Sequence, residues 1–301
     1  MNDILLDQLN KERIETRNGV LLSSLTSFRI GGPCRGAVFP RSAEDMKKTL
    51  AVLSGERVFV LGNGTNVLFS DGGFDGYVIS TTALSGFDTR DEGENVKITA
   101  LSGTGMTSLA FRCARLGYSG LEFAYGIPGS VGGAVYMNAG AYEHDVSEVV
   151  LSSEYVTESG SEGVLNGKDH SFGYRKSAYM DGGKVIISAT FTLKKDDAAR
   201  SMALCDEYMA RRKAKQPLEY PSAGSFFKRC PGHYTGEMIE KCGLKGFSVG
   251  GARVSEKHAG FIINAGGATA KDVTELARIV AEKVFDKFGV RIENEVRLIE
   301  C

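Results

Sequence analysis

The chain has 301 residues, of which 42% are hydrophobic and 24% are charged, and its formal net charge is −1 at pH 7. This composition is typical of a soluble globular protein with roughly two or three hydrophobic cores, and the balanced charge argues against a nucleic-acid partner held through its phosphates. Glycine accounts for 38 residues, nearly double its usual share of about 7%, which favours binding sites built from the backbone.

The cysteines and histidines give no metal signature. The six cysteines include no Cys-x-x-Cys pair and the four histidines no His-x-x-x-His spacing, so we expect no metal. The first residues are acidic and amphipathic, unlike a signal peptide, and no run of about 18 apolar residues predicts a membrane span. The sequence therefore predicts a cytoplasmic protein with reduced thiols and no membrane partner.

The first part of the chain alternates helices with short strands. Helical periodicity and capping residues predict helices over residues 3–14, 42–54 and 104–116, with Ser42 and Thr104 as caps. Runs of apolar and β-branched residues predict strands over residues 57–61, 67–70, 77–80, 96–101, 146–156 and 184–193.

The pattern changes near Lys194. A helix is predicted from residue 195 to 215, where Gln216-Pro217 ends it. Beyond it we expect helices over 235–241 and 271–288 and strands over 249–254, 261–264 and 292–299. Alternation in the last strand puts one set of residues on an apolar face and another on a charged face: Ile292, Val296 and Leu298 against Glu293, Glu295 and Arg297. We therefore divide the chain into a cofactor-binding region, residues 1–195, and a smaller α+β unit, residues 196–301.

Two glycine-rich turns are the strongest signal of a ligand. Gly62-Asn63-Gly64-Thr65-Asn66 follows an apolar run, and residues 126–142 (GIPGSVGGAVYMNAGAY) contain five glycines and no charge. The N–H groups of such turns can hold an anion without a lysine. Either turn alone is typical of a tight turn or a well-packed helix start, whereas the two together favour a large cofactor whose phosphates lie on backbone amides.

The known nucleotide fingerprints are not matched. Val67 and Ser108 stand where the third glycine of a Rossmann loop would be needed after Gly62 and Gly103, and Gly167-Lys168 continues into Asp169 rather than into the Ser or Thr of a P-loop. Any dinucleotide must therefore be held by another architecture.

Three polar groups could carry chemistry. Ser225 lies in Pro221–Lys228 between a glycine and two phenylalanines, with Lys228 nearby. A capped loop with two Phe anchors explains this segment better when it is taken alone, and the segment is not a Gly-x-Ser-x-Gly elbow. Arg175, after Gly173-Tyr174, could present its planar fork to a carboxylate or phosphate, or it could be a solvated arginine on a turn. The third group is Glu293, Glu295 and Arg297 in the last strand. The charged outer face of an edge strand would carry the same residues.

Together these segments resemble the UDP-N-acetylenolpyruvoylglucosamine reductase family, flavoenzymes of bacterial peptidoglycan precursor synthesis. The resemblance begins at Ser27-Phe28-Arg29-Ile30-Gly31-Gly32 and extends to the C-terminus. Seven further motifs follow in the family's order, at residues 61–66, 126–133, 137–142, 174–177, 222–228, 258–264 and 295–297.

The resemblance implies an α+β fold: a two-lobed FAD-binding unit of the vanillyl-alcohol-oxidase (PCMH) type, with lobes at about residues 1–70 and 71–195, followed by a UDP-sugar substrate domain. FAD is expected to bind without a covalent link. The residues that the family's motifs assign to it are Gly62, Asn63, Gly64, Thr65, Asn66, Gly126, Ile127, Pro128, Gly129, Ser130, Gly132, Gly133, Asn138, Ala139 and Gly140.

The resemblance also implies the reaction. NADPH reduces FAD and leaves, and UDP-N-acetylglucosamine enolpyruvate then enters the same cleft and becomes UDP-N-acetylmuramate. Hydride arriving at C3 leaves negative charge that spreads from C2 into the carboxylate, where Arg175 and a protonated Glu295 would stabilise it. Ser225 would protonate C2 as the general acid. The expected substrate-binding residues are Tyr174, Arg175, Gly224 and Lys228.

The chain resembles the shorter branch of the family. Only residues 177–183 separate the Tyr-Arg-Lys-Ser motif from the next strand, so the inserted loop that places a tyrosine over the substrate in the longer branch is missing. We expect a monomer. Two rival functions are a flavin oxidase that uses oxygen instead of NADPH, and a UDP-sugar-binding protein without flavin or catalysis.

Overall fold

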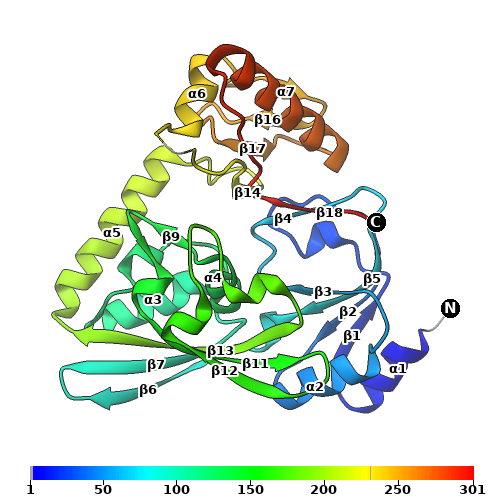
Figure 1. The fold of residues 1–301 in the computed structure, drawn as a ribbon, viewed down its shortest axis with the longest axis vertical. Helices are drawn as coiled ribbons and strands as arrows, with labels where there is room; N and C mark the ends of the chain where they lie inside the picture. Colours follow the sequence, from blue (N-terminus) through cyan, green and yellow to red (C-terminus); the bar gives the residue numbers. More distant parts are fainter. Residues whose placement is uncertain (1–2, 231) are drawn as a thin grey trace. The chain divides into compact units, whose positions relative to one another are not determined.

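The computed structural model describes residues 3–230 and 232–301 (Figure 1). The chain divides into two units that interleave along the sequence. Unit 1 comprises the chain up to Asn18, Gly36–Asn63 and Gly76–Arg212, and unit 2 comprises Gly19–Arg35, Gly64–Asp75 and Lys213–Cys301. Met1, Asn2 and Pro231, which the predicted domains include, lie outside the described residues.

One part of unit 1 is a four-stranded sheet in the order β1-β2-β5-β3. Its strands are β1 (Glu15–Asn18), β2 (Cys34–Phe39), β5 (Phe74–Ser80) and β3 (Val58–Leu61), and β3 runs parallel to β5. Helices α1 (Ile4–Lys11) and α2 (Ala43–Val52) begin at the caps Asp3 and Ser42 and bury Leu6, Leu9 and Met46 in the core of this lobe. Because β5 belongs to this sheet, the predicted lobe boundary at about residue 70 is too early.

The other part of unit 1 is an antiparallel sheet in the order β12-β11-β13-β7-β6, with β8 added to β13. Helices α3 (Met106–Arg115) and α4 (Val131–Met137) lie over one face of it (Figure 1). Ile98, Leu109, Val135 and Phe191 contribute to the core between helices and sheet. The strands are β6 (Phe87–Glu92), β7 (Asn95–Leu101), β8 (Tyr118–Ser119), β11 (Val150–Thr157), β12 (Glu162–Asn166) and β13 (Lys184–Lys195), and the hairpin β9 (Gly140–Ala141) and β10 (His144–Asp145) stands apart.

Unit 1 extends beyond the predicted boundary at residue 195 into helix α5 (Ala198–Lys215). Tyr208 on α5 stacks on Tyr142 with ring centroids 4.2 Å apart, and the Tyr142 hydroxyl donates to the Tyr208 carbonyl at 2.7 Å. The side chain of Arg212 lies so close to Gly126 that a Cβ added there would be 3.0 Å from the Arg212 Cδ. These contacts place most of α5 in unit 1, although the residue pattern of the chain changes near Lys194.

Unit 2 contains a four-stranded sheet, β14-β17-β16-β15, with helices α6 (Thr235–Lys241) and α7 (Ala270–Phe288). Thr269 and Asp272 form a capping box at the start of α7, and the helix buries an apolar stripe that includes Val273, Leu276 and Val280. The strands are β14 (Ser222–Ser225), β15 (Ser248–Val249), β16 (Ala252–Val254) and β17 (Phe261–Asn264), and β4 (Val67–Phe69) pairs in parallel with β18 (Arg297–Ile299).

Several predicted elements differ from the structure for local reasons. The strand expected over 146–156 begins at Val150 because Val146–Glu148 forms a 3-10 turn that Asp145 caps. The strand expected over 249–254 is a hairpin, since Gly250 has φ +52° and reverses the chain. The last strand covers only Arg297–Ile299, and Leu298 is exposed, unlike Ile292 and Val296.

Two helix starts also differ. Gly105 rather than Thr104 is the N-cap of α3, because the Thr104 hydroxyl is bonded to the backbone of Gly86. Strand β13 continues to Lys195, so α5 begins at Ala198 with Asp197 accepting the N–H groups of its first turn. The sequence predicted no strands at β1, β2, β6 or β12. Strands β1, β6 and β12 lie at sheet edges, whereas β2 is an internal and largely buried strand that the sequence analysis missed.

Across the described residues, no helix is both long enough and apolar enough to cross a membrane. The same residues contain no group of three or more His, Cys, Asp or Glu side chains placed to hold a metal ion.

Candidate active site

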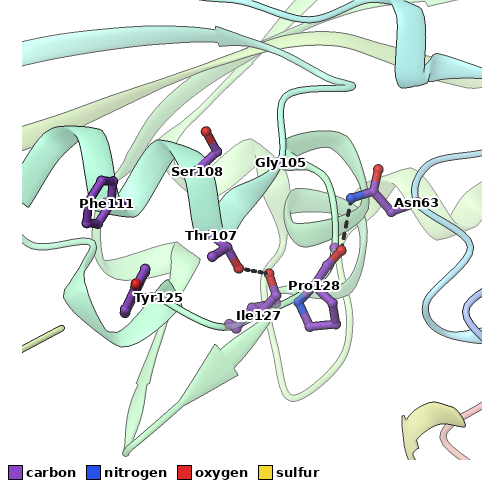
Figure 2. Close-up of a pocket in the computed structure, with 9 residues that line it drawn as sticks. Asn63, Gly105, Thr107, Ser108, Phe111, Tyr125, Ile127 and Pro128 are labelled. Atoms are coloured by element: carbon purple, nitrogen blue, oxygen red, sulfur yellow. Dashed lines mark hydrogen bonds between the residues drawn. The ribbon is translucent and has the colours of Figure 1, made fainter. Parts of the chain in front are cut away.

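A groove in unit 1 brings the two predicted glycine turns together (Figure 2). It has a volume of about 440 Å³, and Asn63 from the first turn and Ile127, Pro128 and Gly129 from the second line it. The side-chain amide of Asn63 donates to the carbonyl of Pro128 at 2.9 Å, across a sequence separation of 65 residues. The two predicted turns are therefore in contact, and their binding of one cofactor stays a prediction.

Close packing explains why parts of these turns must be small. A Cβ added to Gly62 would lie 2.4 Å from the Ser130 Oγ, and one added to Gly132 would lie 2.8 Å from the Cβ of Ser102. Ser130 is buried and caps α4 by accepting the N–H of Gly133. A tight turn and a well-packed helix start, the alternative to a ligand site, thus account for Gly62, Ser130 and Gly132. In contrast, Asn63 and residues 127–129 face the groove.

The start of α3 forms another wall of the groove. Gly105 and Ser108 line it, and the Met106 N–H donates to the Gly129 carbonyl at 2.9 Å. Thr107 fixes the second turn, since its hydroxyl donates to the Ile127 carbonyl at 2.8 Å (Figure 2). The same hydroxyl accepts the Gly126 N–H at 3.2 Å. The first N–H groups of a helix have no intrahelical partner and carry partial positive charge, which suits a phosphate.

The remaining wall is aromatic. Phe111 and Tyr125 stack with their ring centroids 5.8 Å apart and their planes 22° from parallel. In Figure 2 they lie at the end of the groove away from Asn63. Among the described residues, the nine that line the groove carry no charge. A groove with apolar rings at one end and backbone amides at the other fits a cofactor that combines ring systems with phosphates, as FAD does.

The second half of the first turn belongs to unit 2. Gly64 has φ +62°, and a Cβ there would lie 2.2 Å from the Leu25 carbonyl oxygen, so only glycine fits. Asn66 is joined to the last part of the chain, because its side-chain amide donates to the Glu295 carbonyl at 3.3 Å and its own carbonyl accepts the Arg297 N–H at 3.1 Å. The predicted cofactor residues Gly64, Thr65 and Asn66 are thus attached to the segment that carries Glu295.

The predicted cofactor residues Asn138, Ala139 and Gly140 are not among the residues that line the groove. Asn138 ends α4 in the left-handed conformation, and its buried amide donates to the Gly173 carbonyl at 3.1 Å and accepts the Ser147 N–H at 3.1 Å. This side chain therefore supports the turn that carries Arg175, and a contact of these residues with the cofactor stays a prediction.

Arg175 occupies a tight turn in which Gly173 and Lys176 exchange backbone hydrogen bonds. Its φ is +53°, a conformation that costs a non-glycine residue about 1 kcal/mol or more. The guanidinium donates to the carbonyls of Asn138 and Gly140 at 3.4 and 3.5 Å and lies 5.1 Å from the centre of the Tyr174 ring. A strained arginine held by several contacts is typical of a functional site rather than of a solvated surface turn.

Ser225, Glu295 and Lys228 lie close together in unit 2. Ser225 ends β14 opposite Phe261, after Gly224 with φ +78°. The Glu295 N–H donates to the Phe226 carbonyl at 2.8 Å, which holds the two segments side by side.

Lys228 continues this pairing. Its N–H donates to the Glu293 carbonyl at 2.8 Å, and its ammonium group contacts the Glu293 carboxylate at 2.9 Å. That contact lowers the pKa of Glu293, although both side chains are well exposed.

The structure therefore brings together three sets of predicted residues: Asn63 with Ile127, Pro128 and Gly129; Asn138 and Gly140 with Arg175; and Asn66, Ser225 and Lys228 with the Glu295 segment. Arg175 belongs to unit 1, and Ser225 to unit 2.

Sequence reasoning missed Gly105, Thr107, Ser108, Phe111 and Tyr125 as groove residues. A signal existed at Gly103-Thr104-Gly105, a glycine turn before a helix, which the sequence analysis considered only as a failed Rossmann loop. The contact between Thr107 and Ile127 depends on tertiary structure and leaves no local pattern in the sequence.

Comparison with known proteins matches two family models to successive parts of the chain. Residues 34–165 match the family described as FAD binding domain, and residues 216–299 match UDP-N-acetylenolpyruvoylglucosamine reductase, C-terminal domain. These matches confirm the predicted α+β fold class, an FAD-binding unit followed by a smaller domain.

Whole-length relatives are also found. UDP-N-acetylenolpyruvoylglucosamine reductase of Clostridium novyi is 43% identical over 99% of this chain and 96% of its own, and that of Pediococcus pentosaceus is 45% identical over 92% of each. The crystal structure of UDP-N-acetylenolpyruvylglucosamine reductase from Thermus caldophilus superposes with a TM-score of 0.79 at 33% identity and covers 95% of this chain and 99% of that one.

Proposed function

Because the chain belongs to the UDP-N-acetylenolpyruvoylglucosamine reductase family, we propose that it reduces UDP-N-acetylglucosamine enolpyruvate to UDP-N-acetylmuramate with NADPH and FAD. This reaction is a step in peptidoglycan precursor synthesis. One observation carries the proposal: the similarity to named reductases extends over 99% of the chain and therefore includes both the cofactor groove and the Ser225 segment.

The proposed cofactor residues are those whose backbone lines the groove. Gly105, the turn of Ile127, Pro128 and Gly129, and the amide of Asn63 would hold the FAD phosphates without a cationic side chain. When bound, FAD accepts a hydride from NADPH and supplies it to the enolpyruvyl group. We assign this function to unit 1 and the binding of the UDP-sugar mainly to unit 2.

The proposed catalytic residues act on the charge that the hydride brings. Addition at C3 places negative charge on C2 and the neighbouring carboxylate, so the Arg175 fork binds the carboxylate and Glu295 is the second residue proposed to stabilise it. Ser225 gives its proton to C2. A serine hydroxyl is a weak acid, but the carbanion at C2 is a strong base. Gly224 and the buried ring of Phe226 on either side fix the backbone that carries the hydroxyl.

Lys228 would act through an exchange of partners. Its ammonium group is paired with the exposed carboxylate of Glu293, and such exposed pairs are worth little. We propose that Lys228 leaves Glu293 for an anionic group of the substrate, either the diphosphate or the carboxylate. Tyr174, half exposed beside Arg175, is the proposed aromatic contact to the substrate.

The absorption spectrum of the purified protein tests the function most directly. We expect a flavin spectrum that NADPH bleaches and that the enolpyruvyl substrate restores without oxygen. A colourless protein would favour the sugar-binding alternative. An oxidase would be favoured if NADPH did not reduce the flavin. Its substrate would then reduce the flavin, and oxygen would rapidly reoxidise it.

The steady-state pattern gives a second test. The sequence carries no second nucleotide fingerprint, so NADPH and the UDP-sugar are proposed to use one site in turn. Double-reciprocal plots should then be parallel, with inhibition by excess UDP-sugar. Intersecting lines, which a ternary complex would produce, contradict the shared site.

We further propose that the protein acts in the cytoplasm, where NADPH and nucleotide sugars are available, and that it acts as a monomer without a nucleic-acid or membrane partner. Sedimentation equilibrium in the presence of FAD would measure the mass of the particle. A mass of twice 32.3 kDa would contradict the monomer.

A further inference from the structure

Three buried side chains form a hydrogen-bonded chain beneath the loop that carries Arg175. The Ser153 hydroxyl on β11 lies 2.7 Å from His170 Nε2 and 2.6 Å from the Tyr179 hydroxyl. All three residues are at most 1% exposed. The ring of His170 also stacks on Phe172, with centroids 4.7 Å apart and planes 4° from parallel. None of them lines the groove or bears on the proposed chemistry directly.

The direction of these hydrogen bonds is fixed by their partners. His170 Nδ1 lies 3.0 Å from the Gly167 carbonyl, which can only accept, so Nδ1 carries a proton. Burial lowers the pKa of His170, so the ring is neutral and Nε2 accepts from Ser153. The Ser153 oxygen must then accept from Tyr179. Ser153 is therefore the central residue, which donates to one end of the loop and accepts from the other.

The loop between these two ends is the one that holds Arg175. Residues 170–179 lie in the connection between β12, which ends at Asn166, and β13, which begins at Lys184, and both His170 and Tyr179 are tied to Ser153. Within the loop, the Gly173 carbonyl accepts from Asn138, and the buried Ser177 hydroxyl donates to the Tyr136 carbonyl at 2.8 Å. Arg175, with φ +53°, lies between these fixed points. A conformation that is unfavourable by itself persists only where the surroundings over-determine it.

We propose that Ser153, His170 and Tyr179 are positioning residues that hold the Arg175 loop in the conformation that binds the substrate carboxylate. The inference rests on the proposed function, in which Arg175 meets that carboxylate. Without the hydrogen bonds among Ser153, His170 and Tyr179, which we call the clamp, the loop would relax to conformations in which the Arg175 backbone is not strained. The apparent affinity for the enolpyruvyl substrate would then fall in proportion to the fraction of molecules that still have the binding conformation.

The hydrogen-bond order predicts graded effects. Ser153→Ala removes both bonds, whereas Tyr179→Phe removes one and leaves the bond between Ser153 and His170. A net hydrogen bond of about 1 kcal/mol corresponds to roughly fivefold in an equilibrium. We therefore expect the dissociation constant of the enolpyruvyl substrate to rise roughly tenfold or more in Ser153→Ala and about fivefold in Tyr179→Phe.

Calorimetric titration of the oxidised, FAD-loaded protein without NADPH measures this binding in the absence of turnover. UDP-N-acetylglucosamine, which lacks the carboxylate, should bind wild type and both variants alike. Ser188→Ala is the matched control, since Ser188 is also buried on the same strand pair but donates to Glu154 at 2.8 Å, away from the loop. It should leave both dissociation constants unchanged at a comparable loss of thermal stability.

A double-mutant cycle separates positioning from general destabilisation. In an Arg175→Ala background, Ser153→Ala should cause no further loss of affinity for the enolpyruvyl substrate, because both changes act through the same guanidinium. Additive losses, or equal losses for both ligands, would overturn the inference. If Ser153→Ala does not fold, the same cycle with Arg175→Ala can be made with Tyr179→Phe, which removes a single oxygen.

The two proposals fail in different ways. An FAD-loaded wild type that does not reduce the enolpyruvyl substrate contradicts the proposed function and this inference with it. An active wild type in which Ser153→Ala and Tyr179→Phe bind like Ser188→Ala contradicts the clamp alone.

Discussion

The cofactor groove of unit 1 and the Ser225 segment of unit 2 are built on opposite principles. The groove depends on backbone and on glycines that leave no room for a side chain. A Cβ at Gly62 would lie 2.4 Å from the Ser130 Oγ, and the turn at residues 127–129 lines the cavity directly. The Ser225 segment is held by backbone bonds to Phe261 and Glu295, and its proposed chemistry depends on one hydroxyl. The groove should therefore fail when atoms are added, and the Ser225 segment should fail when one atom is removed.

The largest effect is expected from adding atoms in the groove. Gly129→Leu would fill space that the cofactor needs, and we expect the purified protein to lose its FAD completely and with it all activity. Flavin absorbance after gel filtration measures the content. Circular dichroism should show that the fold persists, since the Gly129 carbonyl can still accept from Met106.

Gly72→Leu is the matched control for that variant. Gly72 is exposed, and a Cβ there would meet only ordinary contacts at 3.7 Å and beyond. This variant should keep its flavin. If Gly129→Leu also purifies with full flavin content, the groove is not the FAD site and the first half of the comparison fails.

A smaller but more selective effect is expected from removing the Ser225 hydroxyl. In Ser225→Ala, NADPH should reduce the flavin at a rate near that of wild type, while reoxidation by the enolpyruvyl substrate should fall by roughly two to four powers of ten, the usual worth of a positioned general acid. Ser225→Cys keeps a donor and should recover part of the loss. Stopped-flow absorbance follows both half-reactions separately.

Ser222→Ala in the same strand provides the control, because Ser222 contributes its backbone carbonyl to the bond with Ser27, which the substitution retains. It should change neither half-reaction. A Ser225→Ala protein with a slow NADPH step and a normal enolpyruvyl step would rule out the proton-donor assignment.

The same contrast explains what the sequence could predict. Backbone-built sites need glycine, and glycine is visible in the sequence: Gly62, Gly64 and the run at 126–133 mark both turns. The helix at 271–288 and the long strands β7, β11 and β13 were likewise predicted, because their apolar periodicity is local. The fold class followed from the family's motifs and is confirmed by the matching FAD-binding and C-terminal families.

Sites built from distant side chains left no such pattern. Thr107, Phe111 and Tyr125 are ordinary residues on a helix and a loop, and only tertiary packing brings them to Ile127 and Pro128. Ser153 and Tyr179 are equally unremarkable in the sequence, although they are buried beneath the Arg175 loop. The boundary at 195 was misplaced for the same reason, because the contact of Tyr208 with Tyr142 spans 66 residues.

The smallest effect should come from Thr107, where the groove depends on a side chain after all. Thr107→Val keeps the shape but removes the bond to the Ile127 carbonyl and the acceptor of the Gly126 N–H. With a net contribution of about 1 kcal/mol for such a bond, the dissociation constant of FAD should rise roughly fivefold, without the complete loss expected for Gly129→Leu. Equilibrium titration of apoprotein with FAD measures it. Thr107→Ser, which keeps the hydroxyl, should bind nearly as wild type, and Thr99→Val, at an exposed pair of threonines on β7 and β13, should not change FAD binding. A loss in Thr107→Ser as large as in Thr107→Val would mean that the methyl group and not the hydroxyl matters, and the turn would then be held by packing rather than by this hydrogen bond.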